Sequence, residues 1–103
     1  MRKNKKEYLS KYLIQESKIN RLKQMKRTNE NFKFRYDNEI KKSLALRNEI
    51  EEKIDEVKND VLREILYNKY ILGKTLEEIS YIVNYSKRHV ERLHIKALDE
   101  III

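Results

Sequence analysis

The sequence predicts an all-α protein, with a long helical arm over residues 1–59 and a smaller helical domain over residues 60–103. Two observations support this fold class. The 103 residues include no proline and only one glycine, so few positions favour a sharp turn or a helix break. Apolar residues, mainly Ile, Leu and Tyr, recur at helical spacing, while charged residues make up 40% of the chain and supply the opposite faces.

The arm is expected to begin with a helix from Asn4 to Arg27. Asn4 can cap its start, and Glu7 stands at the third helical position, which is the arrangement of a capping box. The apolar residues of this segment form one stripe: Tyr8, Tyr12, Ile19 and Leu22, with Leu9, Leu13 and Met25 beside them.

The helical period breaks at residues 28–31, and residues 32–36 then alternate aromatic and basic side chains. We expect this second stretch to be a loop or the start of a helix, with its aromatic rings packed into the arm. A second long helix is expected from Asp37, with a heptad-like seam that Arg47 interrupts. The seam consists of Ile40, Leu44, Ile50, Ile54 and Val57. The sequence leaves open whether this helix ends near Asn59, and whether the arm is an antiparallel hairpin or an intermolecular coiled coil.

The smaller domain is expected to start with a helix over Val61–Leu72, which Gly73 ends because glycine favours the left-handed conformation after a helix. Thr75 and Glu78 then match the capping box of a short helix. Asn84 follows at the point where the chain must turn, and asparagine tolerates the left-handed conformation better than most residues.

Ser86 can cap the last helix, whose two faces differ in character. The face expected to be buried carries Val90, Leu93, Ala97 and Ile101. The opposite face carries Arg88, Arg92 and Ile95. Two short helices joined by such a turn form a helix-turn-helix, whose second helix enters the major groove of DNA. Cations at residues 87–89 and acids at residues 99–100 interact unfavourably with the dipole of this helix. A phosphate bound at the start of the helix would make the cations there favourable.

Residues 75–101 resemble the helix-turn-helix of region 4 of sigma-70-type sigma factors. The shared features are Thr75-Leu76-Glu77-Glu78-Ile79, Ser86-Lys87-Arg88, Val90, and Lys96-Ala97-Leu98. Residues 62–70 resemble the preceding region 4 helix, so the resemblance covers about residues 60–101. Residues 85–94 resemble small phage and prophage proteins of Gram-positive bacteria, of the RinA and ArpU types, which carry such a domain behind a helical arm.

The resemblance implies a transcription regulator that binds double-stranded promoter or operator DNA, with RNA polymerase as a further candidate partner. The residues expected to contact DNA are Lys74, Thr75, Tyr81, Ser86, Lys87, Arg88, His89, Glu91, Arg92 and Lys96. Glu91 stands where sigma factors usually have a basic residue, so we expect their docking mode without their usual promoter sequence. No region 2 is recognisable, so we do not expect a complete sigma factor. A homodimer is expected, because one short helix buries little surface on DNA.

The net charge of +7 is concentrated in the arm, where residues 1–36 hold 12 Lys or Arg and 3 Asp or Glu. Such an excess suits a nucleic acid, a surface of RNA polymerase or another acidic protein. The arm is therefore expected to lie along flanking DNA, to dimerise or to contact the polymerase.

Other classes of function find little support in the sequence. The chain has no cysteine, and His89 and His94 do not have the spacing of a metal site, so we expect no metal or other cofactor. His94 lies beside the buried stripe and is expected to be a half-buried group with a hydrogen-bond partner. No catalytic constellation is present, so we do not expect an enzyme. With no signal peptide and no membrane span, a cytoplasmic protein without a membrane partner is expected. Two alternatives stay open, a small terminase-like packaging subunit and a region 4 mimic that binds a protein without DNA.

Overall fold

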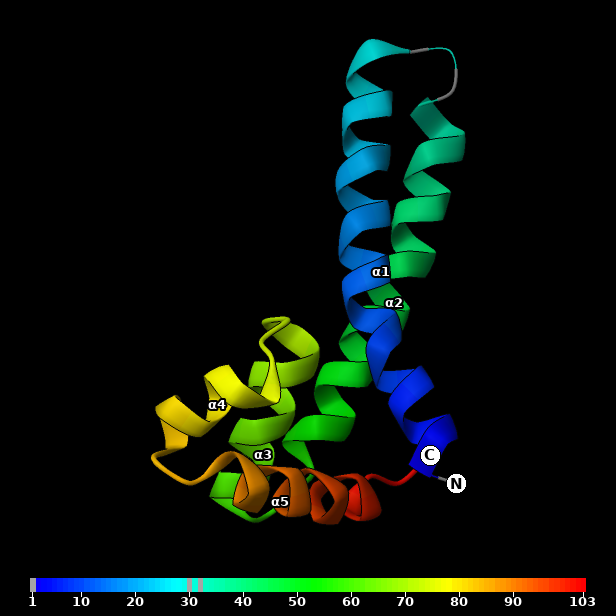
Figure 1. Ribbon diagram of the computed structural model, residues 1–103. Coiled ribbons are helices and arrows are strands. Elements are labelled where there is room, and N and C mark those ends of the chain that lie inside the picture. Colours follow the sequence, from blue (N-terminus) through cyan, green and yellow to red (C-terminus); the bar gives the residue numbers. More distant parts are fainter. Residues whose placement is uncertain (1, 30, 32) are drawn as a thin grey trace.

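The computed structural model describes residues 2–29, 31 and 33–103, and these residues form an all-α fold, as the sequence predicts. The described helices are α1 (Arg2–Thr28), α2 (Lys33–Asp55), α3 (Asp60–Leu66), the π-helical turn η2 (Tyr67–Ile71), α4 (Leu76–Val83) and α5 (Lys87–Glu100). Helices α1 and α2 project together from the group formed by α3, α4 and α5, and the chain measures 52 × 26 × 21 Å (Figure 1).

Helices α1 and α2 form an antiparallel hairpin within one chain (Figure 1). Its outer half has a small apolar cluster, to which α1 contributes Ile19 and Leu22 and α2 contributes Ile40. Three ion pairs join the two helices: Lys18 with Glu39 at 3.5 Å, Lys26 with Asp37 at 2.5 Å, and Arg47 with Glu16. Of the two arrangements that the sequence left open for the arm, the described residues therefore form the hairpin.

The start of α1 differs from the sequence prediction. Helix α1 already begins at Arg2, so Asn4 lies inside the helix and the predicted cap at Asn4 is wrong. Contact with α5 explains the longer helix, because Arg2 forms a bidentate ion pair with Asp99, through Nε–Oδ1 at 2.9 Å and Nη2–Oδ2 at 3.0 Å. Local capping preference at Asn4 is thus overridden by a tertiary contact.

Helix α2 begins at Lys33, so residues 33–36 form the start of a helix, which is one of the two alternatives expected for this stretch. The Phe34 side chain in its first turn is 80% exposed, so the expected packing of this ring into the arm is wrong. Tyr36 does pack against the outer cluster of the hairpin. Phe32, the third ring of this stretch, lies outside the described residues.

Helix α2 and helix α3 are separate, which answers the question of continuity. Helix α2 ends at Asp55, and Asn59 caps α3 by accepting a hydrogen bond from the Leu62 backbone N–H at 3.0 Å. Val57 lies in the connection and is buried in the main core, so this break is packed against the rest of the chain.

The single helix predicted for Val61–Leu72 is α-helical only as far as Leu66 and then widens into η2. The Leu72 N–H donates to the Tyr67 carbonyl five residues earlier, at 3.0 Å. Gly73 ends the segment with φ of 71°, as its predicted left-handed position requires. The wider turn places Tyr70 in the main core, where it meets α5.

One core joins the base of the hairpin to the C-terminal helices. It comprises Leu9, Tyr12, Ile50, Ile54, Val57, Leu62, Leu66, Tyr70, Ala97, Leu98 and Ile101. Because both hairpin helices contribute to this core, the base of the arm and the C-terminal helices support each other. The two ends of the chain lie close together at this base, and the tip of the hairpin lies far from them (Figure 1).

Candidate nucleic-acid interface

The start of α4 is held by a complete capping box. The Glu78 N–H donates to Thr75 Oγ1, and the Thr75 N–H donates to Glu78 Oε1, each at 3.1 Å. The hydrogen bond from the Thr75 backbone lowers the pKa of Glu78 below its ordinary value. The predicted capping box is confirmed, and the Thr75 hydroxyl, expected to contact DNA, is used within the chain as a cap.

The turn between α4 and α5 has the two features that the sequence predicts. Asn84 adopts the left-handed conformation, with φ 61° and ψ 39°, and its N–H donates to the Ser80 carbonyl. Ser86 caps α5, because its Oγ accepts a hydrogen bond from the His89 N–H at 3.1 Å. These local bonds set the angle at which α5 leaves α4.

The back of α5 is anchored on three neighbouring elements. Val90 is fully buried with Ile65 of α3 and Ile79 of α4. Further along, His94 Nε2 and the Tyr70 hydroxyl form a buried hydrogen bond of 2.7 Å. His94 is only 4% exposed, so it is more deeply buried than expected, and it has the hydrogen-bond partner that we predicted.

Burial keeps the side chains of His94 and Tyr70 in their neutral forms. It lowers the pKa of His94 to about 4, with smaller contributions from the cations Lys69 and Lys6. It also raises the pKa of Tyr70 to about 12. Both groups are therefore neutral near pH 7, and a neutral pair is suited to a buried position.

The front of α5 presents cations to solvent. Arg88 and Arg92 are exposed, one turn apart, and neither forms an ion pair with any described carboxylate. The Arg92 guanidinium donates to His89 Nδ1 at 3.4 Å, and the Tyr85 ring meets the His89 ring edge-on at 4.8 Å between centroids. His89 is thus half-buried under its neighbours, whereas Glu91 and Lys96 are exposed on the same helix.

A hollow of about 500 Å³ lies beside the turn. It is lined by Glu77, Ser80, Tyr81, Asn84, Tyr85, Ser86 and Lys87. The hollow brings together three of the predicted contact residues, Tyr81, Ser86 and Lys87. Lys74 and Thr75 lie instead at the opposite end of α4, and Lys96 lies two turns along α5 from Arg88. Tyr85 lines the hollow although the sequence reasoning did not select it.

The charged residues at both ends of α5 are unfavourable for its helix dipole, and tertiary contacts offset them at one end. Its first turn contains no acidic residue, so Lys87 and Arg88 stand uncompensated at the positive end. At the other end, Arg2 holds Asp99 and lowers the pKa of its carboxyl group, and the Lys5 ammonium lies 3.5 Å from the Asp99 carbonyl oxygen. The unfavourable acid is therefore compensated within the chain, but the cations at the start of α5 are not.

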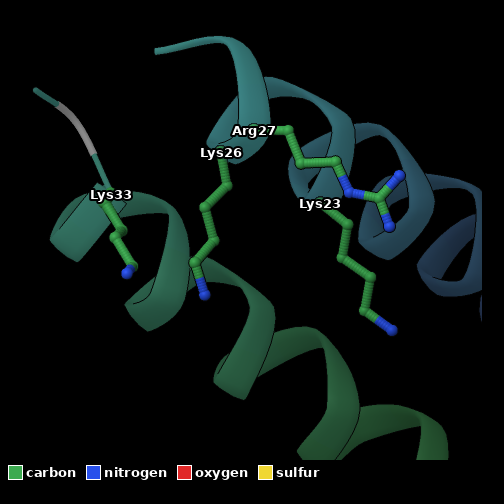
Figure 2. Close-up of a pocket in the computed structure, with 4 residues that line it drawn as sticks. All are labelled: Lys23, Lys26, Arg27 and Lys33. Carbon is green, nitrogen blue, oxygen red and sulfur yellow. The ribbon is translucent and has the colours of Figure 1, made fainter. Parts of the chain in front are cut away.

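A second group of cations lies at the tip of the hairpin. Lys23, Lys26 and Arg27 in the last turns of α1 and Lys33 at the start of α2 line a hollow of about 580 Å³ (Figure 2). The sequence showed the basic excess of the arm as a whole. It did not show that these four side chains line one hollow, because Lys33 comes near the others only when the chain folds back as a hairpin.

No protein-family model, no curated protein and no solved structure matches this chain. Over the part of the chain that the structure describes, no group of three or more potential ligands is arranged to hold a metal ion. Within the same residues, none of the helices has both the length and the apolar character that crossing a bilayer requires.

Proposed function

We propose that this protein is a phage-type transcription regulator that binds promoter or operator DNA through α4 and α5. The observation that carries the proposal is the combination on α5 of a buried back at Val90 and exposed guanidinium groups at Arg88 and Arg92 that form no ion pair with any described carboxylate. Such a helix can enter the major groove, where an arginine can form two hydrogen bonds to one guanine. The resemblance of residues 75–101 to sigma region 4 supports the same docking mode.

Phosphate contacts would flank this reading face. Lys87 and the backbone at the start of α5 are placed to meet a phosphate, which would offset the unfavourable charges in the first turn. Tyr81, 79% exposed on the neighbouring helix, and Lys74 are further candidates for backbone contacts. Contacts of this kind position a protein on DNA, whereas contacts to base edges give it specificity.

The test begins with selection of binding sites from random duplex DNA by the full chain. An enriched sequence is expected, and Arg88→Ala and Arg92→Ala should each weaken binding to it by about 1–3 kcal/mol. Lys42→Ala is the control, since it removes one positive charge from an exposed position on α2. Failure to enrich any sequence, or unchanged affinity in both α5 variants, would contradict the proposal.

We propose further that the regulator acts as a homodimer, because a single short helix buries too little DNA surface for high specificity. Neighbouring apolar side chains at Leu13 and Ile14 are 42% and 62% exposed on α1 and offer a surface for such pairing. Sedimentation analysis should show a dimer. A large ring would instead favour a packaging subunit, and capture of RNA polymerase without a shift of DNA would favour a region 4 mimic.

A further inference from the structure

The tip of the hairpin is strongly basic, although Asp37 and Glu39 at the same end pair with Lys26 and Lys18. Residues 18–35 contain seven Lys or Arg residues and one acidic residue. By contrast, the inner half of α2 carries Glu49, Glu51 and Glu52, which would repel a polyanion. Positive potential is therefore concentrated at the end of the long axis, away from α5 (Figure 1).

Among the residues that the structure describes, most of the cations around the tip hollow have no ion-pair partner. Lys26 is paired with Asp37 at 2.5 Å, but Lys23, Arg27 and Lys33 form no ion pair with any described carboxylate. Figure 2 shows all four side chains around the space where the ends of α1 and α2 come together. Holding like charges around one hollow is unfavourable in isolation, and a bound polyanion would relieve it.

An exposed aromatic residue stands in the same helical turn as one of these cations. Phe34 directly follows Lys33 in the first turn of α2, and its side chain is 80% exposed, although it does not line the hollow. Cations alone would suit an acidic protein or a DNA duplex equally well. An exposed ring within the same turn as a cation favours unpaired bases, since a base in a single strand can stack on the ring while the neighbouring phosphates meet the cations. Bases within a duplex are already stacked on each other and do not offer this contact.

We propose that the hairpin tip binds single-stranded nucleic acid, with Phe34 stacking on a base and Lys23, Arg27 and Lys33 contacting phosphates. This site is separate from α5, and its existence does not depend on the proposed function. If both sites operate, the protein holds a duplex at one end and an unpaired strand at the other.

The test uses the full chain and labelled oligonucleotides of about 12 nucleotides, a length within the range that single-strand sites cover. Poly-U RNA, poly-dT DNA and a mixed-sequence duplex are compared by fluorescence anisotropy over a series of salt concentrations. The variant K23Q/R27Q/K33Q removes the three cations that form no ion pair with a described carboxylate. The control K11Q/K42Q/K58Q removes three exposed lysine charges elsewhere. Circular dichroism verifies that both variants keep their helix content.

Binding of the single strands should depend on the tip more strongly than binding of the duplex does. The tip variant should lower their affinity at least tenfold and reduce the salt slope by about 2, while the control changes both much less. Phe34→Ala should weaken binding by about fivefold or more, and Phe34→Tyr should retain it. Preference for the RNA or for the DNA strand would identify the source of the ligand, and either preference supports the site.

Two outcomes would overturn the inference. Equal losses in the tip and control variants would mean that general charge alone attracts the strand. An unchanged single-strand affinity in Phe34→Ala, together with an equal loss of duplex affinity in the tip variant, would mean that the tip contacts phosphates without stacking on a base. The α5 variants distinguish the two proposals, because Arg88→Ala and Arg92→Ala should leave single-strand binding intact even if the duplex proposal fails.

Discussion

The buried hydrogen bond between His94 and Tyr70 predicts that acid weakens the anchoring of α5. Above pH 6.5 the imidazole is neutral in both the folded and the unfolded chain, so the contact contributes fully. As the pH falls below 6.5, the unfolded chain binds a proton that folded His94 cannot accept until about pH 4. The free energy of unfolding should therefore decrease across this window.

The size of the effect follows from the pKa of His94. Moving this pKa from 6.5 to about 4 corresponds to a loss of about 3 kcal/mol by the acid end of the window. His94 is deeply buried, so little of this is lost to solvent screening. In a chain of this size, whose whole stability is of the order of 5–10 kcal/mol, such a loss is large.

Urea unfolding followed by circular dichroism, repeated between about pH 7.5 and pH 4, measures this dependence. His94→Gln is the matched variant, because its amide does not titrate and can still pair with the Tyr70 hydroxyl. Exposed carboxylates titrate equally in both proteins, so the difference between the two curves isolates His94. Parallel curves for the wild type and His94→Gln across the whole window would show that His94 does not cause the pH dependence.

Three further changes test the elements that position α5. Gly73→Ala should destabilise the protein by about 1–2 kcal/mol in thermal unfolding, because φ is 71° and the new Cβ would lie 3.3 Å from Leu13 Cδ1; a neutral effect would contradict the left-handed assignment. Ser86→Ala should cost about 1 kcal/mol by loss of the cap, and Ser86→Asp should restore it. Ile65→Ala should cost about 2–5 kcal/mol, since this side chain is fully buried beneath α4 and α5, and a loss well below 1 kcal/mol would mean that the site collapses or is not packed.

Local interactions were readable from the sequence because both partners lie within a few residues. The cap at Thr75, the turn at Asn84 and the cap at Ser86 each involve bonds spanning three or four positions. Helical periodicity alone likewise placed Val90 inside and Arg88 outside. These features needed no knowledge of the rest of the fold.

Longer-range features escaped the sequence reasoning. The predicted cap at Asn4 is wrong because the helix begins earlier, at Arg2, whose side chain forms an ion pair with Asp99 near the other end of the chain. The widening at η2 was not foreseen, since nothing in the local period distinguishes a π-helical turn from a continuing α-helix.

The composition and periodicity of this sequence determined by themselves that the chain is all-helical, where most of its helices lie and which side of the last helix faces solvent. The folded structure was needed to show that the arm folds back as a hairpin, that Tyr70 reaches His94, and that Lys33 joins the cations of α1. These contacts join residues that lie far apart along the chain. Capping and amphipathicity act over one or two turns, whereas these contacts depend on how whole helices pack, which no local pattern encodes.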